Sequence, residues 1–353
     1  MHSGITRHHN ERGVALLMTI VIIAIASILV MDLTFRARYD HRHARAFSEG
    51  VQGDYILKSG VSIGRILLEV PKLPGSNGDN LGEPWAVAAA FPNVIPTEIA
   101  ADTRLAIVDE DGKIDLNAPV SVGSSQPPPG STQPPGQGGQ AGQGGATTYW
   151  QDVETSLFQK LGFVREPYDA RENRTRGNTG LDAATQVAVI DDWVDRDRDS
   201  FSGAGRGAGL APQAPKQWFL NRPLKSMSEL LLVPGISLER ASRIAPFVKA
   251  GNGGFPRINI NTAPSEVLLA LGVPESSVSE ILAAQSKGLD DQTLNALTAG
   301  LPQLRSATKL NSNNFSIYVR AEMPNVTRWV KAYVTAQGGA QQRKTQVVKQ
   351  EFY

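Results

Sequence analysis

The chain has 353 residues, enough for about two or three domains with sizeable cores. It carries 35 lysines and arginines against 34 aspartates and glutamates, so its net charge of +1 gives no overall attraction to nucleic acid or anionic lipid. It has no cysteine, which excludes disulfides, thiolate metal sites and cysteine nucleophiles. No histidine follows His43, so a Ser-His-Asp triad or a histidine-bound zinc is nearly excluded beyond that residue.

An uncharged apolar segment, Val14–Met31, follows a short polar leader. As a helix it would rise about 27 Å, close to the hydrocarbon thickness of a bilayer. It is longer than the core of a typical signal peptide, and no small-x-small cleavage site follows it. Charged residues begin at Asp32, but no proline occurs before Pro71 and apolar residues continue at helical spacing. The sequence predicts one long helix with its first third, 14–31, in a membrane; an ordinary signal anchor is the alternative.

In two stretches, apolar residues occur at alternate positions, as in the strands of a β-hairpin. The first, Arg104–Pro119, has apolar residues on either side of the turn-forming sequence Asp-Glu-Asp-Gly. The second, Asn314–Thr335, turns at Pro324-Asn325. Two hairpins are not stable alone, so we expect them to pair with each other and to pack on the outer part of the long helix.

The region between the hairpins has two parts. Residues 121–148 are rich in proline, glycine and glutamine and carry neither charge nor an aromatic residue before Tyr149, which predicts a disordered linker. Residues 149–311 show helical spacing interrupted by sharp breakers.

The predicted fold class is therefore α+β: a pilin-like long N-terminal transmembrane helix on a small antiparallel sheet, with a large inserted, mainly helical domain containing helix-hairpin-helix-like repeats. The expected divisions are a leader (1–13), the transmembrane part of the helix (14–31), the first part of the body (32–120), the linker (121–148), the inserted domain (149–311), the C-terminal hairpin of the body (312–335) and a flexible tail (336–353). For the tail, a last edge strand is the alternative.

The helix-hairpin-helix pattern centres on Pro234-Gly235, and a weaker copy turns at Gly272-Val273-Pro274. In DNA-binding proteins such hairpins hold a phosphate through backbone N–H groups, and nearby basic residues supply the salt-dependent affinity. Here glutamates oppose the basic residues around the first hairpin, and the second is mainly acidic. These charges favour a structural packing role over nucleic-acid binding.

An acidic stretch occurs in the predicted helical domain. Its carboxylates are those of Asp191, Asp192, Asp195, Asp197 and Asp199. Their spacing suits a hard cation such as calcium. It is not an EF-hand, because a loop counted from Asp195 has Ser200 and Arg206 where glycine and glutamate are required. The alternative is a solvated acidic segment balanced by its own arginines.

The start of the apolar segment resembles the cleavage junction of type IV prepilin-like proteins. A polar leader ends at Gly13, and Val14 opens the apolar run. The resemblance implies cleavage after Gly13 by a prepilin peptidase, methylation of the new N-terminus and retention of the helix. Most members have glutamate at the fifth mature position, where this chain has Met18. A filament-tip subunit has no subunit above it whose terminal amine needs a buried carboxylate partner, so an apolar residue there costs nothing.

Three further stretches resemble the protein K family of type II secretion systems, whose members are minor pseudopilins. They are Val108–Pro119 (VDEDGKIDLNAP), Val189–Asp199 (VIDDWVDRDRD) and Ile260–Leu271 (INTAPSEVLLAL). In the last, Thr262 is the expected N-cap of a helix. The resemblance implies an inserted domain whose hairpin repeats serve packing and whose acidic residues bind calcium, the only cofactor expected.

We therefore predict a minor pseudopilin that caps the tip of the periplasmic pseudopilus and helps to initiate its assembly for the export of folded proteins. Its expected place is the bacterial inner membrane, single-pass, with the bulk of the chain in the periplasm. The expected partners are the I and J pseudopilins, with no catalysis, nucleic acid or small-molecule substrate. The alternatives are a membrane-anchored DNA-uptake receptor and a minor pilin of a type IV pilus. A count of flanking positive charges favours the opposite membrane orientation.

Overall fold

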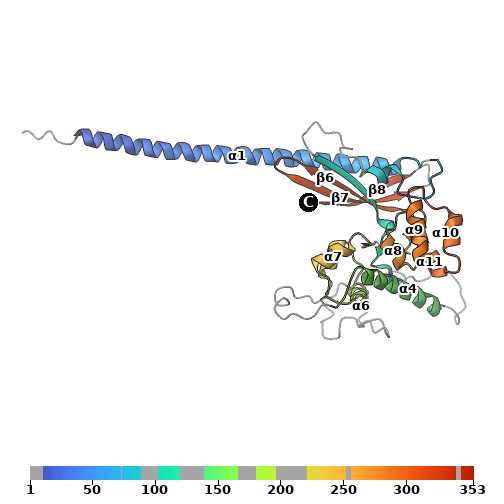
Figure 1. Cartoon of the computed structure of the whole chain (residues 1–353). Coiled ribbons are helices and arrows are strands. Elements are labelled where there is room, and N and C mark those ends of the chain that lie inside the picture. Colours follow the sequence, from blue (N-terminus) through green and yellow to red (C-terminus); the bar gives the residue numbers. More distant parts are fainter. Residues whose placement is uncertain are drawn as a thin grey trace, which may run out of the picture.

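The computed structural model describes residues 11–72, 74–88, 102–119, 139–165, 180–195, 221–251, 256–338 and 343–353; the side chains of 11–13 and 139–146 are outside the description. The chain forms a long rod with a head at its far end, and the head has two parts (Figure 1). One part is a sheet that lies along the rod, and the other is a group of short helices beneath the end of the sheet. Residues 120–138 of the expected linker lie outside the described residues.

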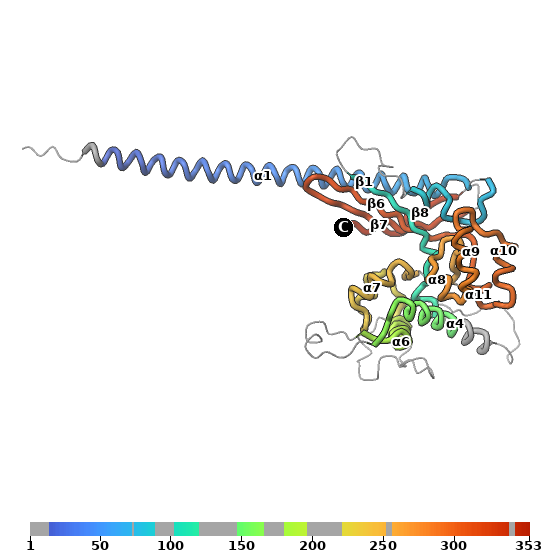
Figure 2. Tube along the Cα trace, in the orientation of Figure 1, coloured from blue at the N-terminus to red at the C-terminus, as the bar shows by residue number. Residues whose placement is uncertain are grey.

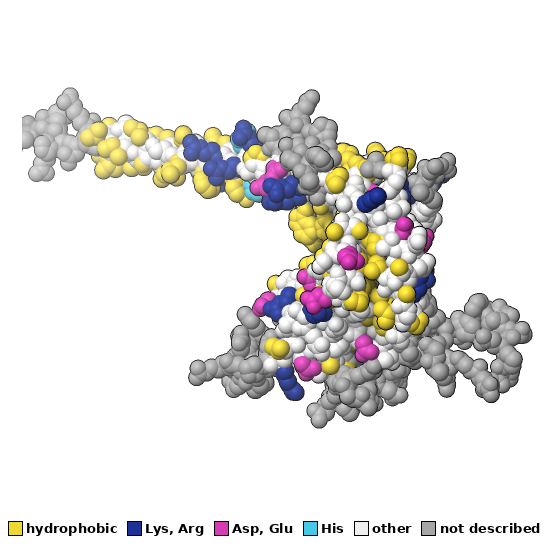
Figure 3. All heavy atoms as spheres, turned by 45° about the vertical axis from the view of Figure 1, so that its right-hand side comes forward, with side chains coloured by type: hydrophobic (Ala, Val, Ile, Leu, Met, Phe, Trp, Pro, Cys, Tyr) yellow, Lys and Arg dark blue, Asp and Glu magenta, His cyan; other side chains and the backbone are white. Residues whose placement is uncertain are grey.

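The rod is a single helix, α1 (Glu11–Glu69), of 59 residues. At 1.5 Å per residue it is about 88 Å long. Its apolar part, from Val14 to Met31, is not covered by any other described segment, and each large apolar side chain there is exposed. Among the described residues it is the one helix long and apolar enough to cross a membrane. Figure 3 shows this apolar part of the rod in yellow, followed by a cluster of basic side chains in dark blue. The prediction of one long apolar helix is confirmed.

The sheet is antiparallel with the strand order β1-β6-β7-β8. Its strands are β1 (Asp102–Asp109), β6 (Asn314–Glu322), β7 (Thr327–Gln337) and β8 (Lys344–Phe352). Alternate side chains of these strands, such as Phe315, Ile317 and Val330, are buried against α1 and the short helix α2 (Pro84–Val87). Gly64 allows the close approach, since a Cβ there would come within 2.8 Å of Ile317 Cγ2. The predicted helix-on-sheet body is confirmed.

Three sequence predictions about the body are wrong in detail. Residues 104–119 do not form a hairpin: β1 pairs with β6, whereas β2 (Ile114–Asp115) pairs in parallel with β3 (Val248–Lys249) of the inserted domain. The expected flexible tail, 336–353, instead contributes the end of β7 and all of β8, because β7 offers a free edge to a strand of suitable length. The expected linker, 121–148, overlaps the start of α4, which begins at Gly139.

The inserted domain is built from short elements between β1 and β6, visible as the lower group in Figure 2. They are β2, α4 (Gly139–Lys160), α6 (Ala183–Val194), the 3-10 helix η4 (Met227–Leu232), α7 (Leu238–Ile244), β3, β4 (Ile258–Asn259), α8 (Ser265–Ala270), α9 (Glu275–Ala284), α10 (Asp291–Leu297), α11 (Pro302–Ala307) and β5 (Thr308–Lys309). On α4, Trp150, Val153 and Leu157 form one apolar stripe at helical spacing, and this stripe is buried in the domain core.

The body and the inserted domain have separate hydrophobic cores. The core of the body contains residues of α1 and the four-stranded sheet, and the other contains residues from Ile114 to Leu310. The chain passes from one core to the other at the 3-10 helix η2 (Glu110–Gly112) and returns just before β6. What holds the head together is therefore the contact region around these two crossings.

Candidate functional site

The junction between the two cores is centred on three consecutive acidic residues, Asp109, Glu110 and Asp111, all buried. They end β1 and form η2, whose first turn is capped by Asp109: its Oδ1 accepts a hydrogen bond from the backbone N–H of Asp111 at 2.8 Å. Gly112 is required by close packing, because a Cβ there would lie 2.7 Å from the hydroxyl oxygen of Thr262. The sequence DEDG is thus a crossing between layers rather than a hairpin turn.

Asp111 binds the inserted domain to the body. Lys249 Nζ from β3 lies 2.7 Å from its Oδ1, and Lys309 Nζ from β5 lies 2.6 Å from its Oδ2. The backbone N–H of Asn313 and the side-chain amide of Asn314 also donate to it, at 2.9 and 3.0 Å. The two ammonium groups hold the pKa of Asp111 well below its ordinary value despite its burial. One carboxylate therefore connects β3, β5 and the start of β6.

The two neighbouring acids contact other segments. Asp109 Oδ2 accepts hydrogen bonds from Ser312 Oγ at 2.5 Å and Thr262 Oγ1 at 2.6 Å. Thr262 was expected to be a helix N-cap, and that prediction is wrong, since α8 begins after Pro264 and the Thr262 hydroxyl serves Asp109 instead. Glu110 turns toward the sheet, where it accepts from Ser316 Oγ at 2.5 Å and pairs with Lys113.

These groups affect stability in opposite directions as pH changes. Burial and the neighbouring Asp111 raise the pKa of Asp109 to about 6. Its ionisation therefore lowers the stability of the fold as pH rises from its unfolded-state pKa toward 6. Asp111, whose pKa is lowered, contributes stability that is present above its unfolded-state pKa and is lost as pH falls further. The ion pairs and hydrogen bonds of the junction are therefore strongest when Asp111 is ionised.

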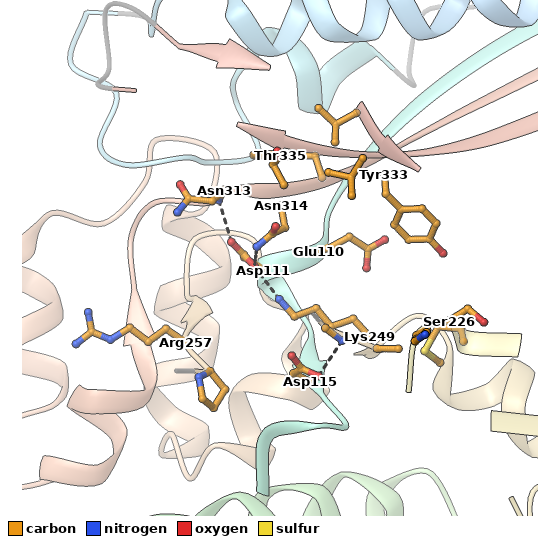
Figure 4. A pocket seen from close by; sticks show the side chains of 18 of the residues that line it. Glu110, Asp111, Asp115, Ser226, Lys249, Arg257, Asn313, Asn314, Tyr333 and Thr335 are labelled. Atoms are coloured by element: carbon orange, nitrogen blue, oxygen red, sulfur yellow. Dashed lines mark hydrogen bonds and ion pairs between the residues drawn. The ribbon is translucent and has the colours of Figure 1, made fainter. Parts of the chain in front are cut away.

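A cavity of about 280 Å³ lies beside the junction, between the outer face of the sheet and the inserted domain (Figure 4). Tyr333 and Thr335 of β7 lie on its upper side in this view, and Ser226 and Lys249 lie below them. Its lining includes five basic side chains (Lys225, Lys249, Arg257, Lys309 and Lys331) and three acidic ones (Glu110, Asp111 and Asp115).

The described residues include only part of the acidic stretch that was expected to bind calcium. Asp191 and Asp192 are buried near the end of α6, Asp195 is its C-cap, and Asp197 and Asp199 lie outside the described residues. Asp191 Oδ2 accepts from Gln151 Nε2 at 2.8 Å. Burial raises the pKa of Asp191 to about 7. Within the described ranges, no group of three or more acidic or histidine side chains is arranged to hold a metal ion.

Glu154 on α4 is a functional candidate that sequence reasoning missed. It is completely buried, and among the described residues neither of its carboxyl oxygens has a hydrogen-bond partner; Asp191 Oδ1 lacks one there as well. Burial, followed by the charges of Asp191 and Asp115, raises the pKa of Glu154 well above its ordinary value. The signal available in the sequence was its position in the apolar stripe of α4, four residues after Trp150 and four before Phe158.

The helix-hairpin-helix turn at Pro234-Gly235 packs on its own chain. Gly235 has a φ of +86°, which favours glycine, and a Cβ there would lie 2.3 Å from Gln186 Oε1. Gln186 Nε2 donates to the carbonyl oxygen of Pro234 at 2.9 Å. Nearby, Arg243 pairs with Glu239 and Arg222 with Glu229. This arrangement favours the packing role, and it leaves little unpaired positive charge for a nucleic acid.

The predicted processing residues lie in the first turns of α1. Gly13 is inside the helix, whereas the side chains of Val14 and Met18 are exposed, 57% and 62%. The apolar neighbours of Met18 on the helix are similarly exposed, so no described residue contacts Met18 in a way that would require a carboxylate at that position.

Replacing Asp111 by asparagine tests the junction. The variant Asp111→Asn keeps the shape of the side chain but leaves two buried lysines without their counter-charge. We expect the free energy of unfolding to fall by about 3–5 kcal/mol. Urea unfolding of the full chain in detergent micelles measures this change. The matched control is Asp102→Asn, which breaks an exposed pair with Arg104 and should cost less than about 1 kcal/mol. Equal effects of the two substitutions would contradict the role of Asp111.

Comparison with known proteins gives two findings, and no protein-family profile matches the chain. In sequence, the chain is 25% identical over 255 residues to type II secretion system protein K of Klebsiella pneumoniae, which covers 72% of this chain and 67% of that protein.

In structure, the chain is similar to a chain of the GspK-GspI-GspJ complex of the type 2 secretion system of enterotoxigenic Escherichia coli. The TM-score is 0.58 with 18% identity, over 88% of this chain and 99% of that chain. At this identity the structural likeness is one of fold. Together with the sequence relative it confirms the resemblance to the type II secretion protein K family that was found in the sequence.

Proposed function

We propose that this minor pseudopilin is a non-enzymatic component that caps the tip of the periplasmic pseudopilus and helps to initiate its assembly. The observation that carries this proposal is the position of the inserted domain at the far end of α1, opposite the apolar segment (Figure 1). Helices of further subunits can pack along the rod below the head. A subunit stacked above would meet the inserted domain, which the junction holds rigidly to the sheet.

The partners proposed for this chain are the I and J pseudopilins, because the structurally similar chain was solved in a complex with them. The part of α1 beyond the apolar segment offers a surface for such helix packing. Its exposed large apolar side chains are Leu33, Phe35, Tyr39, Phe47, Val51, Tyr55 and Ile66. Exposed apolar residues along an isolated helix are typical of a surface that another helix covers.

Before assembly, the apolar segment would hold the protein in the bacterial inner membrane as a single span, with the bulk of the chain in the periplasm. Its length and its complete exposure support this placement. The leader would be removed by the prepilin peptidase after Gly13, and Val14 would be methylated. This processing accounts for a retained helix. The count of flanking positive charges favours the opposite orientation, and the processing proposal takes precedence over that count.

We also propose that the inserted domain binds calcium at the end of α6. Two observations support it: Glu154 and Asp191 have buried carboxyl oxygens without a hydrogen-bond partner, and such oxygens are the ligands that calcium prefers. Asp192 and Asp195 lie on the same helix end, and Asp197 and Asp199 follow in the sequence. A bound cation would supply the positive charge that Glu154 and Asp191 lack among the described residues.

The N-terminal mass tests the proposed processing. Protein purified from cells with an active prepilin peptidase should begin at Val14 and carry one added methyl group. The variant Gly13→Val should keep residues 1–13, because the peptidase site is lost, while Gly4→Val should be processed normally. Mass spectrometry of the N-terminal peptide measures each form. Retention of the leader in the unsubstituted protein would rule out this pathway.

Filament labelling tests the capping role. An affinity tag at the C-terminus of this chain, seen with gold particles in electron micrographs, should mark one end of each isolated pseudopilus. The same tag on the major pseudopilin should mark the whole shaft. Labels of this chain at intervals along the shaft would contradict capping.

Thermal unfolding tests the calcium proposal. A calcium concentration 100-fold above the dissociation constant should stabilise the full chain by about 2.7 kcal/mol, which raises the melting temperature by several degrees relative to chelator. Asp191→Asn should abolish the shift without lowering stability in chelator, since one of its carboxyl oxygens is unsatisfied there. The exposed Asp291→Asn on α10 is the control and should keep the full shift. An identical melting temperature with and without calcium would exclude the site.

A further inference from the structure

The face of the sheet that points away from α1 carries an ordered set of aromatic and basic side chains. Trp329 and Tyr353 stack with ring centroids 3.9 Å apart and an interplanar angle of 11°, yet both remain exposed, 41% and 52%. Two residues further along β7, Lys331 Nζ lies 5.1 Å from the centroid of the Tyr318 ring and 4.4 Å from that of Tyr333. These rings are fixed by neighbours before any partner arrives, so binding there would cost little side-chain entropy.

Two hollows lie along this face. One is a shallow groove of about 460 Å³, whose lining includes Arg104, Tyr318, Arg320 and Trp329. The other is the 280 Å³ cavity at the junction, whose lining includes Lys331 and Tyr333. Tyr318 and Lys331 are direct cross-strand neighbours, so the two hollows adjoin. We call this continuous surface the sheet–head groove.

The dimensions of the sheet–head groove fit an extended polypeptide. From Trp329 to Tyr333 the strand advances about 13 Å, the length of about four extended residues. The cavity is smaller than the usual site of a drug-sized ligand or cofactor, for which about 300–1,000 Å³ is typical. It can receive one or two side chains. Tyrosine and tryptophan are also the residues enriched where proteins bind one another.

The charge of the cavity favours a carboxylate. Asp111 is already bound by Lys249 and Lys309, and Glu110 by Lys113, so these acids are neutralised internally. Lys331 Nζ also lies 3.6 Å from Glu110 Oε1, so three of the five basic lining side chains are already paired with these acids. The lining still has two more basic than acidic side chains, and Lys225 is exposed at the surface. Figure 4 shows that the acids Glu110 and Asp115 lie on the wall formed by the crossing segment.

The same face is unsuited to nucleic acid. Arg104 lies 3.2 Å from Asp102, and Arg320 lies 2.7 Å from Glu322, so both exposed guanidinium groups already have carboxylate partners. Few counterions would be released when a phosphate chain binds, and little affinity would result.

We propose that the sheet–head groove binds an extended, acidic segment of a partner polypeptide. A large apolar or aromatic side chain of that segment packs beside Trp329, its backbone crosses the Tyr318–Lys331 pair, and a carboxylate enters the mouth of the cavity near Lys225. This site is separate from the apolar surface of α1 that pseudopilin packing would use, and it does not depend on the tip role proposed above.

A peptide-binding measurement tests the proposal. The probe is a fluorescent eight-residue synthetic peptide with one phenylalanine and, four residues later, two glutamates; the comparison peptide has glutamines in place of the glutamates. Fluorescence anisotropy with the full chain in detergent micelles gives the dissociation constants. We expect the acidic peptide to bind at least about fivefold more tightly than its glutamine form, with the difference reduced in high salt.

Two variants locate the contact. Lys225→Glu should weaken binding of the acidic peptide at least about fivefold, and Trp329→Ala should weaken binding of both peptides. The matched controls are Lys287→Glu and Leu282→Ala, which change an exposed charge and an exposed apolar side chain on or just after α9. Because Trp329 stacks on Tyr353, circular dichroism must first establish that Trp329→Ala is folded; Lys225→Glu changes an exposed side chain.

Several outcomes would overturn the proposal. They are no binding of either peptide, equal binding of the acidic and glutamine forms, unchanged binding by Lys225→Glu, or tighter binding of a glycan oligomer or a single-stranded oligonucleotide under the same conditions. None of these results bears on where labelled protein lies in the filament, so failure of this proposal is distinguishable from failure of the tip role.

Discussion

The head of this protein depends on one buried carboxylate that is shared by two lysines. Asp111 lies where the chain leaves the sheet for the inserted domain, and Lys249 and Lys309 reach it from two small strands of that domain. A buried charge is expensive to desolvate, and this expense is offset only when its partners are correctly placed. The pairing therefore selects one relative position of the two cores, even where it adds little net stability.

That fixed position gives the molecule its shape. The two hydrophobic cores have no common set of buried residues, so apolar packing alone would leave the inserted domain free to reorient about the crossings. The three consecutive acidic residues at the crossing, Asp109, Glu110 and Asp111, contact segments of both parts and restrict this freedom. The head lies at the end of a rod about 88 Å long, at about 1.5 Å per residue, as the proposed tip role would require. Its fixed position also creates the concave face on which the sheet–head groove lies.

The buried acidic residues described in this chain fall into two groups, which differ in whether their carboxyl oxygens have partners. At the junction they are matched by ammonium and hydroxyl groups, whereas Glu154 and Asp191 in the inserted domain retain oxygens without partners. The first arrangement is complete and structural. The second is incomplete within the described residues, which is why it supports a proposal of cation binding and the first does not.

The sequence by itself determined the long helix, the helix-on-sheet body, the helical insertion and the resemblance to the protein K family, because each depends on local periodicity or on motifs readable over a few residues. It also placed the acidic residues of α6 together. Only the tertiary structure decided that 104–119 is a crossing and not a hairpin, that 344–352 is an edge strand, and that Thr262 serves Asp109. The reason is physical. The crossing and the role of Thr262 depend on partners more than 130 residues away, such as Lys249 for Asp111, and the last strand depends on the free edge of β7. Local propensity carries no information about which strand edge or charge will be nearest.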